Sequence, residues 1–272
     1  MDKQARKRAQ AVAEAISPLL HDNFIANDDR VIIADDIAKV SIVGAGMIGR
    51  PGVAAQMFKT LADAGINIQM ISTSEIKVSC VIAAADSDKA IDALCHQFEI
   101  STFSHENAKQ ITAPSVRGVA LDLDRARLAI LQVPDRPGMA AELFGILAAN
   151  NISLDAIIQS QRTRIIAGVP TRDIACTIAQ ADAADAKRVL EAAAPELGCG
   201  AVVVNKSIAK VSIVGAGMIS NPGVAAQMFN CLATAGINIQ MIATSEIKIS
   251  CVVAQSQGID ALKTIHQAFG LG

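Results

Sequence analysis

The chain has 272 residues, 51% of them hydrophobic, and it contains neither Trp nor Tyr, so its core has to be built from aliphatic side chains. A formal net charge of −2 gives no electrostatic reason to expect nucleic acid or an anionic membrane surface as a partner. No apolar run reaches the roughly 18 residues that span a bilayer, and the charged start lacks the apolar core of a signal peptide, so we expect a cytoplasmic protein.

The first 36 residues predict a helix followed by a strand. The segment RAQAVAEAISPLL, residues 8–20, is similar to AKRVLEAAAPEL, residues 186–197, which has the pattern of a second helix within a later unit. We therefore interpret residues 1–36 as the remnant of a preceding unit. On this interpretation the chain is part of a longer polypeptide.

The next stretch predicts a compact unit with two helices. Pro51 stands where a helix can start, and Gly65 stands where it can end. The unit also contains a β-branched run before this helix and two further apolar runs after it. The predicted order is strand, helix, strand, strand, helix, at residues 39–44, 52–65, 66–72, 76–84 and 86–98.

This unit is repeated. Residues 37–82 and 208–253 differ at only eight of 46 positions, and a more distant copy, RLAILQVPDRPGMAAELFGILAANNISLDAIIQSQ, occupies residues 127–161. All three copies place a Pro-Gly pair at the start of the helix. The repeat predicts three units after the remnant, at residues 37–112, 113–206 and 207–272.

A dinucleotide-binding interpretation of the first copy is disfavoured. Gly44, Gly46 and Gly49 form a GxGxxG pattern, but the third glycine is Ser220 in the near-identical copy. The acidic residue expected about 20 residues later is also misplaced, because Glu75 follows Gly49 by 26 residues. The six cysteines form no CxxC pair and the four histidines are scattered, so we expect buried thiols and no metal site.

Each copy is preceded by another short strand and a polar turn, as in AVVVNKSIAKVSIVG, residues 201–215. The result is a βαββαβ unit, so we predict the α+β class: tandem ferredoxin-like domains with antiparallel sheets and helices on one face. The sequence leaves open whether the extra strand joins the sheet of the unit before it or after it.

The segments LQVPDRPGMAAELFGILAANNI and INIQMIxTSEIKISC closely resemble the regulatory ACT domains of aspartate kinase. The order TSEIK, VPDRPG, TSEIK is similar to the duplicated regulatory region of cyanobacterial-type aspartate kinases. The resemblance implies four ACT units in tandem and a kinase domain. The KFGGTS-like motif of that kinase domain does not occur in this sequence, nor does a Walker-type loop.

The resemblance implies a free amino acid, threonine or lysine, as a feedback effector held between a VPDRPG-type and a TSEIK-type unit. On the first of these units the matching positions are Asp135, Gly138, Met139, Ala140 and Gln159. On its partner they are Pro222, Gly223, Val224, Ala225, Asn238 and Ile239. A carboxylate suits the N-terminus of the helix after Pro-Gly, and Asp135 suits the ammonium group.

The near-identity of the repeat predicts a second site, whose other half belongs to a VPDRPG-type unit that the sequence does not contain. Its candidates are Pro51, Gly52, Val53, Ala54, Asn67 and Ile68. The TSEIK segments resemble positions that couple effector binding to inhibition, namely Thr73, Ser74, Glu75, Thr244, Ser245 and Glu246. From the residues alone, Asp135 between two prolines also fits a plain turn, as do Asn67 and Asn238.

No catalytic constellation is present in the sequence, since it offers neither a Ser/His/Asp set nor an acid–base pair of carboxylates. We therefore expect a chain that binds and signals without a catalytic residue or a cofactor. Its expected partners are the amino acid, the kinase domain and a second copy, which would form a homodimer through the ACT sheets. The alternative is an ACT-type dimerisation scaffold with vestigial ligand sites.

Overall fold

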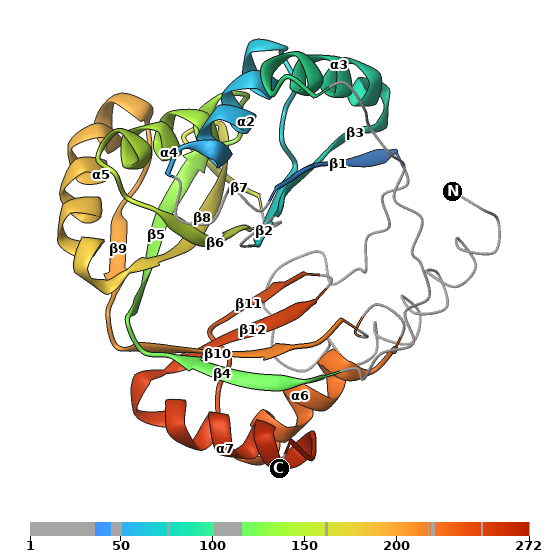
Figure 1. The fold of residues 1–272 in the computed structure, drawn as a ribbon. Coiled ribbons are helices and arrows are strands. Elements are labelled where there is room, and N and C mark those ends of the chain that lie inside the picture. Colours follow the sequence, from blue (N-terminus) through green and yellow to red (C-terminus); the bar gives the residue numbers. More distant parts are fainter. Residues whose placement is uncertain are drawn as a thin grey trace.

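The computed structural model describes residues 36–44, 51–74, 77–100, 116–160, 163–216, 218, 221–245 and 247–271. The predicted remnant, residues 1–36, lies outside this part of the chain except for its last residue. We call residues 37–112 the first unit, residues 113–206 the middle unit and residues 207–272 the last unit. Figure 1 shows the arrangement of their helices and strands.

The first unit follows the predicted order. Its first helix begins after Gly52, which adopts φ 99°, a left-handed conformation that a residue with a Cβ rarely adopts. The same helix is followed by Gly65, at φ 69°. The elements are β1 (Ile37–Val43), α2 (Val53–Asp63), β2 (Met70–Ser74), β3 (Lys77–Ala83) and α3 (Ser87–Gln97), with a short 3-10 turn at Ala84–Asp86.

The middle unit repeats this plan and adds a hairpin. Gly138 precedes its first helix with φ 95°, so the Pro-Gly pair serves the same turn here. Its elements are β5 (Arg125–Pro134), α4 (Met139–Ala149), β6 (Leu154–Gln159), β7 (Arg164–Ile166), β8 (Val169–Ala179), α5 (Ala183–Leu197) and β9 (Val202–Asn205), with a 3-10 turn at Gln180–Asp182.

The last unit is built like the first. Gly223, at φ 99°, precedes its first helix. Its elements are β10 (Ile208–Val214), α6 (Val224–Thr234), β11 (Met241–Thr244), β12 (Lys248–Ala254) and α7 (Gly258–Ala268), with a 3-10 turn at Gln255–Gln257. These antiparallel units confirm the predicted α+β class and ferredoxin-like fold.

The first and middle units share one eight-stranded sheet within a single chain. Its order is β1-β3-β2-β6-β8-β5-β9, and β7 pairs with β8 off this path. The two units meet where β2 and β6 lie antiparallel, with Ser72 opposite Ile158. From the sequence we expected ACT sheets to pair between two copies of the chain, and the structure shows such a pairing between two units of one chain.

The strand β4 (Gly118–Asp122) resolves the question that the sequence left open. It lies before the middle unit in the chain but pairs with β10 of the last unit, in the order β11-β12-β10-β4. In contrast, β9 completes the sheet of the unit that precedes it, through β5. The predicted range 113–206 therefore includes one strand whose sheet belongs to the last unit.

The two sheets face one another, and helices cover their outer faces (Figure 1). One apolar core lies between the eight-stranded sheet and α2–α5, and a second lies between the four-stranded sheet and α6–α7. A small third cluster joins the sheets and includes Ala156, Ile208, Met241 and Val252. Among the described helices, none is long and apolar enough to cross a membrane.

Candidate functional site

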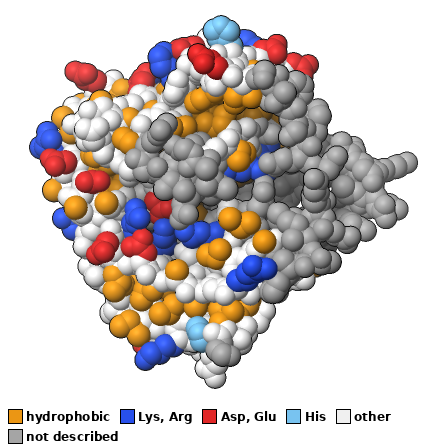
Figure 2. All heavy atoms as spheres, viewed as in Figure 1, with side chains coloured by type: hydrophobic (Ala, Val, Ile, Leu, Met, Phe, Trp, Pro, Cys, Tyr) orange, Lys and Arg blue, Asp and Glu red, His pale blue; other side chains and the backbone are white. Residues whose placement is uncertain are grey.

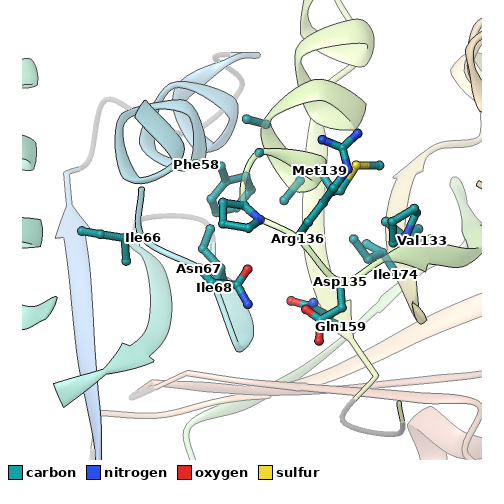
Figure 3. A pocket seen from close by; sticks show the side chains of 15 residues that line it. Phe58, Ile66, Asn67, Ile68, Val133, Asp135, Arg136, Met139, Gln159 and Ile174 are labelled. Carbon is teal, nitrogen blue, oxygen red and sulfur yellow. The ribbon is translucent and has the colours of Figure 1, made fainter. Parts of the chain in front are cut away.

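A hollow of about 400 Å³, a volume that includes the solvent-filled mouth, lies at the junction of the first and middle units (Figure 3). The middle unit contributes the loop between β5 and α4, the end of β6 and part of β8. The first unit contributes Phe58 from α2 and the three residues that follow Gly65. The lining residues are Phe58, Ile66, Asn67, Ile68, Val133, Pro134, Asp135, Arg136, Pro137, Gly138, Met139, Ala140, Ala141, Gln159 and Ile174.

The loop before α4 brings an acid and a helix N-terminus into the same hollow. The backbone N–H of Asp135 donates to the carbonyl of Pro170 at 2.8 Å, which fixes this residue against β8. The N-cap of α4 is Gly138, which has no side chain to cap the first turn. The N–H of Met139 donates to the carbonyl of Arg136 at 3.5 Å. The next two N–H groups, those of Ala140 and Ala141, have no acceptor among the described residues and remain available to an anion.

The carboxylate of Asp135 faces an arginine. Arg172 Nε lies 3.0 Å from Asp135 Oδ2, and the two side chains are only 16% and 13% exposed. The Nε–H group is buried but makes no hydrogen bond to a described residue, so this pair is a charge contact. The guanidinium also donates from Nη1 to the carbonyl of Gln69, at 2.8 Å, which belongs to the first unit.

Packing between α2 and α4 closes the far side of the hollow. Phe58 and Phe144 are buried with ring centroids 5.6 Å apart. The contacts on either side are reciprocal, because a Cβ at Gly52 would lie 3.6 Å from Ala148 Cβ, and one at Gly138 would lie 3.9 Å from Ala62 Cβ. The two units are therefore related by a pseudo-twofold axis at the β2–β6 junction.

The hollow is narrow in this structure. Its walls leave free space for little more than a water molecule between them, although the mouth is open to solvent. Figure 3 shows Asp135 and Gln159 directed toward one another beside Asn67 and Ile68. A larger ligand requires the walls to move, either by rearrangement of the lining side chains or by a shift of one unit against the other.

The structure places the predicted site residues differently from the expected pairing. Asp135, Gly138, Met139, Ala140 and Gln159 do share one hollow, as expected. Their partners across the junction, however, are Asn67 and Ile68 of the first unit, which we had assigned to a separate second site. Asn238 and Ile239 of the last unit do not line this hollow.

The matching loop of the last unit lines a hollow of its own, of about 580 Å³. Pro222, Gly223, Val224 and Ala225 contribute to it, together with Thr244 and Ser245. These positions repeat the half of the first hollow that the middle unit provides, and every described residue that lines this second hollow belongs to the last unit. Of the other second-site candidates, Pro51, Gly52, Val53 and Ala54 line neither hollow.

The TSEIK segments lie where the units meet. Thr73 is buried at the β2–β6 junction, where its hydroxyl accepts from the N–H of Ile157 at 2.8 Å and donates to the carbonyl of Asp155 at 3.4 Å. Ser74 pairs with Lys77 through the backbone of the β2–β3 hairpin. Glu75 and Glu246 lie outside the described residues.

A buried ion pair joins the last unit to the middle unit. Lys210 Nζ contacts Asp155 Oδ2, and the two side chains are 7% and 13% exposed. Thr177 donates to the same carboxylate oxygen at 3.1 Å. Asp155 therefore contacts all three units, because its carbonyl accepts from Thr73 and its carboxylate from Lys210.

The cysteines are packing residues. Burial raises the pKa of the Cys176 and Cys251 thiols to about 12 and that of Cys80 beyond the usual range. All six are free thiols. Within the described part of the chain, no group of three His, Cys, Asp or Glu side chains has the arrangement of a metal site.

Comparison with known families decides the class. Residues 40–98 and 211–269 match one ACT domain model, and residues 127–195 match another. The chain belongs to the ACT domain family. These matched ranges coincide with the three copies of the repeat, so each copy is an ACT unit, and the resemblance of the VPDRPG and TSEIK motifs to ACT domains is confirmed.

The relatives are aspartate kinases. The chain is 43% identical over 162 residues to an aspartokinase of Thermus thermophilus, a match that covers 58% of this chain and 38% of the relative. It is 40% identical over 166 residues to the aspartate kinase Ask_LysC of Stutzerimonas stutzeri, covering 61% and 39%. The chain thus spans about two fifths of the length of these curated relatives.

Solved structures agree with this assignment. The aspartate kinase from Synechocystis superposes with a TM-score of 0.89 at 57% identity, over 97% of this chain and 45% of that one. The ligand-free regulatory subunit of aspartate kinase from Thermus thermophilus superposes with a TM-score of 0.52 at 42% identity, over 57% and 99%. The ACT units of this chain therefore correspond to an aspartokinase regulatory region.

Two elements of the site were not found from the sequence. Arg172 was not among the predicted site residues, although it stands where the other two copies have Ile76 and Ile247. Phe58 was not predicted as a wall of the site, because its equivalent Phe229 lies in a helix of nearly the same sequence. The arginine was detectable as a charge that only one copy carries, whereas the phenylalanine required the structure.

Proposed function

We propose that this chain is an allosteric regulatory region that binds a free amino acid, threonine or lysine, in the hollow between the first and middle units. The observation that carries the proposal is the meeting of Asp135 with the uncapped N-terminus of α4. A zwitterion presents an ammonium group and a carboxylate a few ångströms apart. Asp135 attracts the ammonium group, and the N-terminus of α4 attracts the carboxylate.

Individual residues have distinct roles in this proposal. The Asp135 carboxylate receives the ammonium group, and the N–H groups of Ala140 and Ala141 in the first turn of α4 bind the carboxylate. Gln159, at the end of β6, offers an amide that bonds either group, and Asn67 offers another from the first unit. Ile68, Phe58 and Ile174 contact the side chain of the ligand.

The hollow is narrow, and in this proposal the allosteric response arises because ligand binding widens it. A ligand larger than water that is accommodated by a shift of one unit against the other favours the wider state by its differential affinity. Thr73 and Asp155 lie directly on the moving junction, in keeping with the coupling role expected for the TSEIK segment. In a longer polypeptide, we propose that an aspartate kinase domain is the recipient of this signal, in the cytoplasm.

Calorimetric titration of the chain with threonine and with lysine tests the proposal. We expect binding of at least one of them, weakened about tenfold or more by Asp135→Ala, since that change leaves the ammonium group unpaired. The repeat supplies a matched control, because Asn67 and Asn238 stand in the identical segment GINIQM. Asn67→Ala weakens the same binding and Asn238→Ala does not; no binding of either amino acid contradicts the proposal.

A second candidate is the dimerisation scaffold, favoured by the surfaces that the last unit leaves open. Its strand β11 ends the described four-stranded sheet, and a Cβ at Gly223 would contact nothing within 4 Å, unlike the equivalent Gly52. Figure 2 shows hydrophobic side chains gathered over the last unit at the bottom of the view and over the first unit at the top. Light scattering of the purified chain measures whether a homodimer forms.

A further inference from the structure

The guanidinium of Arg172 connects two units at the edge of the hollow. One side of it lies against the carboxylate of Asp135, 3.0 Å from Nε to Oδ2, and Nη1 donates to the carbonyl of Gln69 at 2.8 Å. Gln69 follows Asn67 and Ile68, which line the hollow, and directly precedes β2. The arginine is only 16% exposed, so solvent screens these contacts weakly.

The contact pattern leaves Asp135 able to bind a second cation. Its carboxylate forms a charge pair with Arg172 but accepts no hydrogen bond from a described residue, and the buried Nε–H is likewise without an acceptor there. A carboxylate offers about four acceptor positions. An ammonium group that enters the hollow therefore has access to Asp135 while the arginine is still present.

The acid and the arginine occur together in one copy of the repeat only. When the copies are aligned on Pro-Gly and on the cysteine of the later strand, Asp135 corresponds to Gly49 and Ser220, and Arg172 corresponds to Ile76 and Ile247. A general need of the fold would place these charges in all three units. Their restriction to the unit with the two-unit hollow indicates a role in that hollow.

We propose that Arg172 is a positioning residue that couples the charge state and occupancy of Asp135 to the first unit at Gln69. This inference deepens the proposed function and relies on it for the identity of the ligand class, an α-amino acid. When a ligand ammonium shares the Asp135 carboxylate, the two cations repel and the guanidinium shifts. Its hydrogen bond to the Gln69 carbonyl carries that shift to the start of β2 and to the β2–β6 junction.

A double-mutant cycle without ligand tests the coupling in the full chain. Backbone amide exchange of the segment 69–74 is measured by mass spectrometry for Asp135→Asn, Arg172→Met and the double variant. Removing the charge of Asp135 changes exchange in this segment on the order of tenfold when Arg172 is present, and less than about twofold when it is absent. Equal effects of Asp135→Asn in both backgrounds overturn the proposal.

A nearby arginine serves as the matched control. Arg164 belongs to the same unit and pairs with Asp173 at 3.6 Å, but its side chain is 53% exposed. Asp135→Asn keeps its full effect on exchange in an Arg164→Gln background. If Arg172→Met does not fold, Arg172→Lys replaces it, because lysine keeps the charge but lacks the fork that reaches Asp135 and Gln69 together.

A second measurement adds threonine and lysine at saturating concentration. In the unmodified chain, the bound amino acid changes amide exchange across residues 69–74. In the Arg172→Met variant, calorimetry still detects binding of the amino acid, but the change in amide exchange is lost. An undiminished response in Arg172→Met overturns the proposal. If the unmodified chain binds neither amino acid, the proposed function fails, and the ligand-free cycle still decides the role of Arg172.

Discussion

The repeat contains two phenylalanines whose truncation should have very different costs. Phe58 and Phe229 occupy equivalent positions in helices of nearly the same sequence. Phe58 is 1% exposed and packs with its ring tilted against Phe144 across the unit junction, whereas Phe229 is half-buried at the surface of the last unit. Phe58→Ala removes a fully packed ring and should cost about 4 kcal/mol, roughly 1 of which comes from the ring pair.

The matched variant Phe229→Ala should cost roughly 2 kcal/mol, since its ring keeps partial contact with water and has no aromatic partner among the described residues. The chain has no Trp or Tyr, so urea unfolding is followed by far-UV circular dichroism. Comparison is restricted to variants whose transitions keep the same slope. If the two variants lose equal stability, the first and middle units do not pack through α2 and α4 as described.

Three further predictions concern the other contacts. Lys210→Met leaves a buried carboxylate unpaired and should cost about 3–5 kcal/mol, whereas Lys39→Met, at the exposed equivalent position, should be close to neutral in the same urea assay. The thiols of Cys176 and Cys251, with pKa values of about 12, should not react with a disulfide reagent at neutral pH until the chain unfolds. Burial is the largest single influence on the pKa of Asp122 and raises it, but the hydrogen bonds from Arg125 and the Asp124 N–H and the charges of Arg125 and Lys210 together outweigh burial and lower that pKa. This carboxylate therefore stabilises the fold above its unfolded pKa, and the contribution disappears as pH falls through the lower folded pKa. Asp122→Asn should therefore cost about 0.5 kcal/mol near neutral pH, and this cost should vanish as pH falls through the lowered folded pKa, as measured by unfolding at each pH.

The elements themselves were accessible from the sequence because each has a local cause. The Pro-Gly pair predicted three helix starts, and in each the glycine adopts a left-handed conformation, at φ 99°, 95° and 99°. The apolar runs predicted the strands, and repetition predicted the units. A position that must adopt the left-handed φ of these helix starts favours glycine, and this glycine is visible in the sequence whichever unit lies next to it.

The partner of each unit left no such signal. The first and last units have the same segment GINIQM, so Asn67 and Asn238 are indistinguishable as partners of Asp135. The destination of β4 was equally hidden, because its alternation fits any ferredoxin-like sheet and the strand it joins follows about 90 residues later in the chain. Side-by-side pairing of sheets depends on edges and faces of the assembled units, which a local pattern does not encode.

Two identical strands show how strongly neighbours decide the outcome. The heptapeptide IAKVSIV forms both β1 and β10, yet β10 pairs on both sides and six of its residues are buried, whereas β1 pairs only with β3 among the described strands. Lys210 in β10 binds Asp155, and its equivalent Lys39 is exposed.

The first and last units therefore have nearly the same surfaces, but these surfaces make different contacts because the middle unit is placed asymmetrically between them. The middle unit has one free edge, at β6, and one Asp135. The first unit pairs with that edge through β2 and lies beside Asp135. Of the two units that could have done so, only the first therefore forms a complete hollow with the middle unit within the described part of the chain. It follows that substitutions at equivalent positions of the first and last units separate ligand binding from sheet stacking, a distinction that neither copy alone would permit.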